Sequence, residues 1–188
     1  MTNLPLAGAS VRLPAASDPD NIALAIIAAA QDLLGHLAAG RRIDSSAIRT
    51  AMQSAFGASD ASGAWDWKTA YEAVEVAQVL FMRRYGPAIH ARSADPFDRL
   101  KLVERIAALA PTQTRRSEEM QLYQQFSTPL GLAWIAGFAA GFGPGELVLE
   151  PSAGTGLLGL EPVLGASSWG LIEVADVRAA LLRQLFGE

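Results

Sequence analysis

The clearest chemical potential in this sequence lies just after a short apolar run at residues 147–149. The chain continues there as Glu150-Pro151-Ser152-Ala153-Gly154-Thr155-Gly156. The two glycines allow positive φ angles and leave room for a ligand to approach the backbone. Leu157 and Leu158 are expected to begin a helix whose first free N–H groups face this loop. A strand, a glycine turn and a helix in this order are typical of the ligand-binding corner of a doubly wound α/β sheet.

A second strand is predicted downstream of this loop. It covers the run Trp169-Gly170-Leu171-Ile172-Glu173 and ends in a carboxylate. Asp176 is expected to cap a last helix that reaches Phe186. We expect the two strands to be parallel and adjacent, because a helical crossover joins them.

Upstream of the first strand, Thr128-Pro129 is expected to cap an apolar helix that continues through Phe138. The glycine and proline residues at 143–145 separate this helix from the strand. The stretch at residues 111–127 is polar and is interpreted as a linker that contains Phe126-Ser127-Thr128-Pro129 at its end.

Four amphipathic helices are predicted for residues 18–110. Their expected starts are Asp18-Pro19, Asp44-Ser45, Asp66 and Asp95-Pro96, and their expected ends are Gly40, Gly57, Gly86-Pro87 and Pro111. Short connections between such helices favour a compact helical module. Residues 1–17 show no periodicity and are interpreted as a flexible leader.

Composition narrows the class of protein further. The chain has 188 residues, of which 51% are hydrophobic and 18% charged, and its net charge is −4, which argues against a generally basic nucleic-acid-coating protein. It has no cysteine and two distant histidines, so we expect no metal site. No signal peptide is evident, and the stretch at residues 129–145 is too short and glycine-rich for a membrane span. A cytoplasmic protein without a membrane is expected.

The order of these motifs resembles that of class I S-adenosylmethionine-dependent methyltransferases, in particular DNA adenine-N6 methyltransferases. In that family a Phe-x-Thr-Pro element precedes the first strand and a glycine motif follows it. More closely, residues 20–188 look like the N-terminal part of bacterial strawberry-notch-type proteins, in which a methyltransferase-like segment precedes a helicase-like part. The closer match is carried by residues 56–60, 63–68 and 111–119.

The resemblance implies a mostly α N-terminal helical module followed by an incomplete α/β Rossmann-like segment, residues 128–188, with two parallel strands. It implies S-adenosylmethionine as the cofactor. Glu150 would hold the cofactor ammonium, Glu173 the ribose hydroxyls, and Phe126 would close over the methionine end. The other residues that the resemblance assigns to the cofactor site are Thr128, Pro129, Pro151, Ser152, Ala153, Gly154, Thr155 and Gly156.

Other interpretations of the glycine loop stay open. A phosphate-binding Walker loop is disfavoured, because Leu157 and not lysine follows Gly156. A nicotinamide site is not excluded, because Gly154, Gly156 and Gly159 satisfy the Gly-x-Gly-x-x-Gly spacing and Glu173 is suitably distant. The loop is also compatible with a simple connection between elements, because glycine is a general turn former.

An adenine-N6 methyltransferase also needs a Pro-Pro-aromatic loop that holds the extruded base, and this sequence has none. We therefore expect a truncated methyltransferase that has no catalytic residues of its own and is inactive alone. DNA would be contacted only by the complete protein, together with the missing C-terminal methyltransferase/helicase segment. The alternative is a non-catalytic helical interaction module, or a gene remnant with a vestigial cofactor fold.

Overall fold

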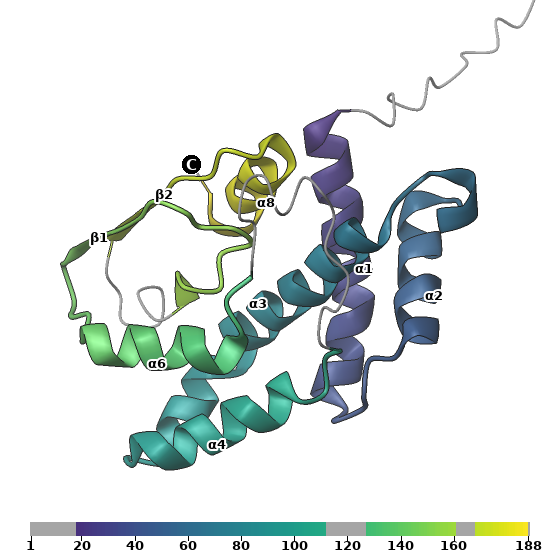
Figure 1. Ribbon diagram of the computed structural model, residues 1–188. Coiled ribbons are helices and arrows are strands. Elements are labelled where there is room, and N and C mark those ends of the chain that lie inside the picture. Colours follow the sequence, from purple (N-terminus) through teal and green to yellow (C-terminus); the bar gives the residue numbers. More distant parts are fainter. Residues whose placement is uncertain (1–17, 112–126, 161–167, 188) are drawn as a thin grey trace, which may run out of the picture.

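The computed structural model describes residues 18–111, 127–160 and 168–187, and shows a mostly helical chain with a small sheet at one side (Figure 1). The predicted leader, most of the predicted linker and Phe126 lie outside the described residues. In chain order the helices are α1 (Pro19–Ala38), α2 (Ser45–Phe56), η1 (Asp60–Ser62), α3 (Trp67–Arg92), α4 (Pro96–Ala107), α6 (Leu130–Ala140) and α8 (Asp176–Phe186). The strands are β1 (Leu147–Glu150) and β2 (Ser168–Leu171).

The first four long helices begin where their aspartates predicted. The carboxylates of Asp18, Asp44, Asp66 and Asp95 each accept a hydrogen bond from a backbone N–H in the first helical turn. An N-cap bond of this kind satisfies a donor that the helix itself leaves free. The sequence therefore sets these starts locally.

The predicted end of α3 was wrong. Gly86-Pro87 was expected to end the helix, but α3 continues through Pro87 to Arg92. Proline removes one hydrogen bond from a helix interior. Burial of Gly86 and Ile89 on the far part of α3 offsets that loss, since both residues pack into the molecule.

Three further local predictions were also wrong. The N-cap of α6 is Pro129 and not Thr128. The proline ring has no hydrogen-bond acceptor, so no side chain caps this helix. Asp176 is the first residue of α8 and not its cap, a place where its charge still favours the helix dipole. Leu157 lies in a turn that continues through residue 159, because the N–H groups of Gly159 and Leu160 bond to carbonyls only three residues back.

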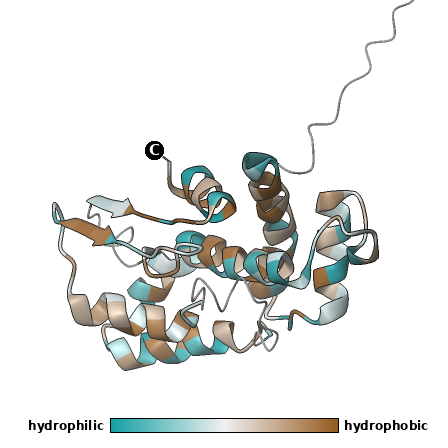
Figure 2. Cartoon of the chain, turned by 45° about the horizontal axis from the view of Figure 1, so that its top comes forward, coloured by the Kyte–Doolittle hydropathy of each residue, from teal (hydrophilic) through white to brown (hydrophobic). Residues whose placement is uncertain are grey.

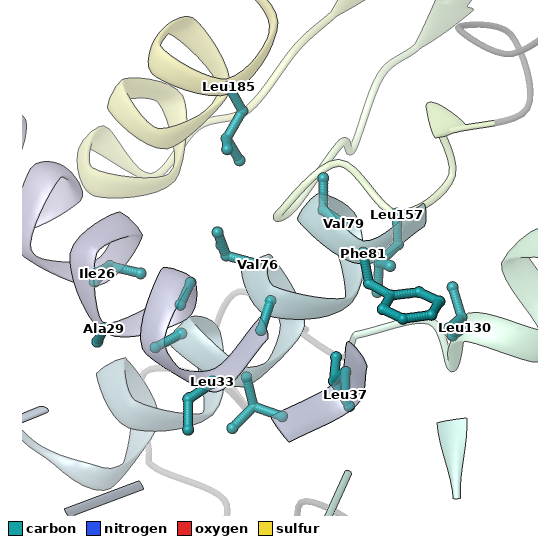
Figure 3. Packing of buried hydrophobic residues seen from close by; sticks show 14 of the residues in the cluster. Ile26, Ala29, Leu33, Leu37, Val76, Val79, Phe81, Leu130, Leu157 and Leu185 are labelled. Atoms are coloured by element: carbon teal, nitrogen blue, oxygen red, sulfur yellow. The ribbon is translucent and has the colours of Figure 1, made fainter. Parts of the chain in front are cut away.

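One hydrophobic core joins the helices. The α1 helix packs against α2, α3 and α8, and Ile26, Leu33 and Leu37 on α1 are almost completely buried. Figure 3 shows these side chains in one cluster with Val76 and Phe81 of α3 and Leu185 of α8. The core thus includes both the predicted helical module and the last helix of the predicted methyltransferase-like segment.

The α1 helix is long and apolar enough to cross a membrane, judged by length and composition alone. In the folded chain one face of this helix is buried in the core, while Leu24 on another face is half-exposed.

The two strands pair in parallel, as predicted, with Leu147 opposite Ser168 and Glu150 opposite Leu171. The second strand is shorter than predicted, so that Ile172 and Glu173 follow it. The Ile172 N–H still bonds to the Glu150 carbonyl at 2.9 Å, which extends the pairing by one residue. The ends of both strands therefore lie side by side.

Candidate functional site

The glycine loop follows the end of β1 and is tied to the chain beyond β2. The Ala153 N–H donates to the Ile172 carbonyl at 2.9 Å, and the Gly156 N–H donates to the Ala153 carbonyl at 2.8 Å. Gly154 has a φ of 56° and Gly156 a φ of 94°. Both angles lie in the left-handed region that other residues adopt at a cost, so the loop needs glycine at both positions.

Gly154 and Gly156 have different structural roles. A side chain at Gly156 would collide with Phe186 and Leu182 of α8, so this glycine permits close packing. No other atom lies within 4 Å of the position that a Cβ of Gly154 would take. Gly154 therefore leaves an open approach to the backbone of the loop.

Glu173, which follows β2, holds the loop in place through hydrogen bonds. Its Oε2 accepts from the Gly154 N–H at 3.0 Å, and its Oε1 accepts from the Ala175 N–H at 2.9 Å. A carboxylate has about four lone-pair sites, so each oxygen can accept a second hydrogen bond. The carboxylate is fixed in place and can still bind a ligand.

A concavity of about 340 Å³ lies over the loop. Its lining combines the loop, the chain after β2, the start of the α6 segment and one residue of α8. The lining residues are Ser127, Thr128, Pro151, Ser152, Ala153, Gly154, Thr155, Leu157, Leu158, Ile172, Glu173, Val174 and Arg178. Seven of the residues that the sequence singled out are thus brought together.

The other predicted site residues are placed elsewhere. Pro129, Glu150 and Gly156 do not line the concavity. The Glu150 carboxylate accepts from the Ser152 N–H at 2.9 Å, so it closes the start of the loop. The place of Phe126 lies outside the described residues.

Beneath the loop lies a polar layer that the sequence analysis did not identify. The Thr155 hydroxyl donates to Oε2 of Glu75 on α3 at 3.1 Å, and Ser127 also hydrogen bonds to Glu75. Nε of Arg178 donates to Oε1 of Glu72 at 2.7 Å, and both of these side chains are buried. The helical region thus contributes charged residues to the floor of the site.

A signal for this layer was present in the sequence. Glu72 and Glu75 lie within the mostly apolar run from Tyr71 to Leu80. The residues between and just after them, such as Val74 and Val76, are buried. A carboxylate in such a run must find a partner, because an unpaired buried charge is costly. Its partners come from residues more than 50 positions away, which no local pattern reveals.

The pKa of Glu75 is raised to about 7, chiefly by burial and to a smaller extent by the neighbouring Glu72 carboxylate. The hydrogen bond from Ser127, the charge of Arg178 and the hydrogen bond from Thr155 act in the opposite direction on this pKa. Perturbed carboxyl groups of this kind gather at functional sites. Glu75 therefore changes charge near neutral pH, directly behind the glycine loop.

No group of three histidine, aspartate or glutamate side chains within residues 18–111, 127–160 and 168–187 is placed to hold a metal ion. Comparison with protein-family models, with curated proteins and with solved structures finds no match to this chain. The function must therefore be argued from the site itself.

Proposed function

We propose that the concavity binds S-adenosylmethionine, and that this chain is the cofactor-binding portion of a DNA methyltransferase of the adenine-N6 type that works with a helicase-like protein. One observation carries the proposal. The glycine loop after β1 and the carboxylate after β2 meet over one concavity, and Glu173 is bonded directly to Gly154. This is the arrangement in which an open α/β sheet binds a nucleoside ligand outside the carboxyl ends of its strands.

Each part of the site has a chemical use in this proposal. The open face of Gly154 would admit the amino-acid portion of the cofactor. The spare lone pairs of Glu173 would accept hydrogen bonds from the two ribose hydroxyls. The Thr128 side chain lies at the rim and supplies a hydroxyl near the start of α6.

The charges favour this cofactor over a nicotinamide dinucleotide. Among the described lining residues, Glu173 and Arg178 are charged, and Arg178 is paired with Glu72. A dinucleotide carries a negative diphosphate, and the lining offers it no cation outside that pair. The sulfonium of S-adenosylmethionine is positive and suits a concavity whose lining presents the carboxylate of Glu173 and an arginine already paired with Glu72.

A nuclear magnetic resonance titration of the whole chain with millimolar S-adenosylmethionine tests the proposal. We expect saturable shifts of the Gly154, Thr155 and Glu173 amide signals, and no such shifts with NAD. Gly154→Ala places a methyl group into the open approach and should weaken binding at least fivefold.

Gly57→Ala is the matched control. Gly57 also has a positive φ, of 72°, and no atom within 4 Å of an added Cβ, but it ends α2 away from the concavity. It should bind the cofactor as the wild type does. Absence of any saturable shift in the loop signals, in a chain shown to be folded, would refute the proposal.

A second candidate function is a protein-interaction module. It is favoured by large apolar side chains that remain exposed on α6, on β1 and in the chain after β2: Leu132, Ile135, Phe138, Leu147, Leu149, Ile172 and Val174. Figure 2 shows the apolar colour on β1 and, in paler tones, on α6, at the left of the picture, while β2 is mostly pale. Exposed apolar groups of this extent mark interaction surfaces. Under this function the titration would leave the loop signals unchanged.

A further inference from the structure

The concavity is surrounded by more negative than positive charge. The Arg178 guanidinium and the Glu72 carboxylate form a close pair and offset one another. The carboxylate of Glu173 accepts from backbone N–H groups, and that of Glu75 from the hydroxyls of Thr155 and Ser127. The charge of Arg178 also acts on Glu75, but this single guanidinium faces three carboxylates, so the net potential at the site is negative.

Glu75 is held in place by both walls of the site. The Thr155 hydroxyl bonds to it from the glycine loop, and Ser127 bonds to it from the segment before α6. Thr155 is almost completely buried and is also one of the residues that line the concavity. The Thr155 side chain thus connects the Glu75 carboxylate to the lining of the concavity.

We propose that Glu75 makes the concavity selective for a positively charged ligand, so that it binds the sulfonium S-adenosylmethionine more tightly than the uncharged thioether S-adenosylhomocysteine. This inference rests on the proposed function and adds to it a specificity-determining residue from the helical region. Attraction between the carboxylate and the sulfonium is strong here because burial weakens solvent screening. The same attraction is lost once the methyl group has been transferred, which favours release of the product.

The selectivity should depend on pH. Burial raises the pKa of Glu75 to about 7, so the carboxylate gains its charge between pH 6 and pH 7.5. The charged groups that face it are Glu72 on its own helix and Arg178 on α8, while Ser127 and Thr155 present hydroxyls. Ionisation of Glu75 would therefore produce the dependence.

The test is a titration of the full chain with each of the two ligands at pH 6 and pH 7.5, followed by the amide signals of the loop. For the wild type we expect the affinity for S-adenosylmethionine to rise up to about eightfold over this interval, the limit set by the fraction of ionised Glu75. The affinity for S-adenosylhomocysteine should change less than twofold. Both ligands also carry an α-ammonium group, which stays mostly protonated over this range.

Glu75→Gln keeps the shape and removes the charge. It should abolish the pH dependence and reduce the preference for the sulfonium about tenfold at pH 7.5. Asp98→Asn, which removes an exposed carboxylate on α4, is the control and should behave as the wild type.

Thr155→Val provides a second variant that keeps the carboxylate. It removes a hydrogen bond that lowers the pKa of Glu75, so the midpoint of the binding curve should move to higher pH. A role of Glu75 in folding alone would change affinity at every pH without moving this midpoint.

The outcomes separate the two proposals. Binding of both ligands with equal pH profiles in the wild type and in Glu75→Gln would overturn the selectivity and leave the cofactor site standing. Failure of both ligands to shift the loop signals would overturn the cofactor site and the selectivity with it.

Discussion

The helical region, residues 18–111, and the loop region, residues 127–160 with 168–187, differ in how they treat apolar side chains. Leu33 of α1 is 0% exposed, whereas Leu147 of β1 is 83% exposed. The helical region buries the apolar faces of its helices against one another. The strands leave Leu147 and Leu149 exposed, and α6 buries one face against α4 while Leu132, Ile135 and Phe138 stay exposed on the other. Stability is thus concentrated in the first region, and the concavity in the second.

Two helices of the loop region pack on the helical region, α6 against α4 and α8 against α1. Arg178 of α8 also pairs with Glu72 of α3. Arg83 of α3 also donates to the Leu185 carbonyl and lies over the Phe186 ring. The helical region therefore supports the site through α8.

Removing the carboxylate of the buried pair should have the largest effect. Glu72→Ala leaves the Arg178 guanidinium buried without its partner, and we expect the free energy of unfolding to fall by about 4 kcal/mol. Urea denaturation followed by circular dichroism measures this change. Asp20→Ala breaks the exposed Asp20–Arg183 pair and should cost at most about 1 kcal/mol. Equal losses in the two variants would show that the buried pair does not join the regions.

Leucine truncation compares the two regions directly. Leu33→Ala creates a cavity in the core and should lower the free energy of unfolding by about 3 kcal/mol. Leu147→Ala, at an exposed position on β1, should change it by less than about 0.5 kcal/mol. Leu24→Ala, at a half-exposed position on α1, is the control within the same helix. A loss for Leu147→Ala as large as that for Leu33→Ala would mean that the exposed strand face is covered in solution.

Substitution of the two loop glycines compares an open position, Gly154, with a packed one, Gly156, in their effect on stability. Gly156→Ala forces a methyl group against Phe186 at a positive φ and should cost about 2 to 3 kcal/mol of stability. Gly154→Ala meets no neighbour and should cost about 1 kcal/mol, which is the backbone penalty alone. Thermal and urea unfolding of both variants measure the difference. If Gly154→Ala were the more destabilising, the open approach to the loop would be in doubt.

The smallest expected effect is the pH dependence of stability that Glu75 introduces. Its folded pKa of about 7 lies above the ordinary value of 4.5, so the folded chain binds the proton more tightly than the unfolded chain does. The stability from this preference is present below pH 4.5 and is lost as the pH rises towards 7 and beyond. Glu75→Gln should therefore stabilise the chain relative to the wild type by about 2 kcal/mol more at pH 8 than at pH 5.

Urea denaturation of both proteins at the two pH values provides this difference. Asp98→Asn again serves as the control, because its carboxylate is exposed. A difference between wild type and Glu75→Gln that stays constant with pH would show that Glu75 is not protonated near neutrality.

Features set by near neighbours were predictable. The four aspartate caps, the two strands and their parallel pairing follow from the cap signatures, the apolar runs and the crossover rule. The errors arose where packing overrides local preference, as at Pro87, where α3 continues because residues beyond the proline are buried. The cap of α6 was also mispredicted, since Thr128 lines the concavity and Pro129 takes the capping position.

The sequence predicted the upper part of the candidate site, the glycine loop and Glu173, but not the buried charged residues beneath it. The glycine loop and Glu173 stand at strand ends, and parallel pairing brings such ends together. Glu150 was assigned to the cofactor from its position after β1, but its carboxylate bonds to the adjacent Ser152 N–H instead. Alternation along a strand does not specify which way the chain turns after it.

The sequence by itself determined where most elements begin and which short segments carry the glycine loop and its carboxylate, because caps, turns and apolar periods act within a few residues. Only the tertiary structure decided that Glu75 and the Glu72–Arg178 pair underlie the loop. Those contacts join positions 80 and 106 residues apart. Their energies depend on burial and on partners from other elements, and these are properties of the packed molecule.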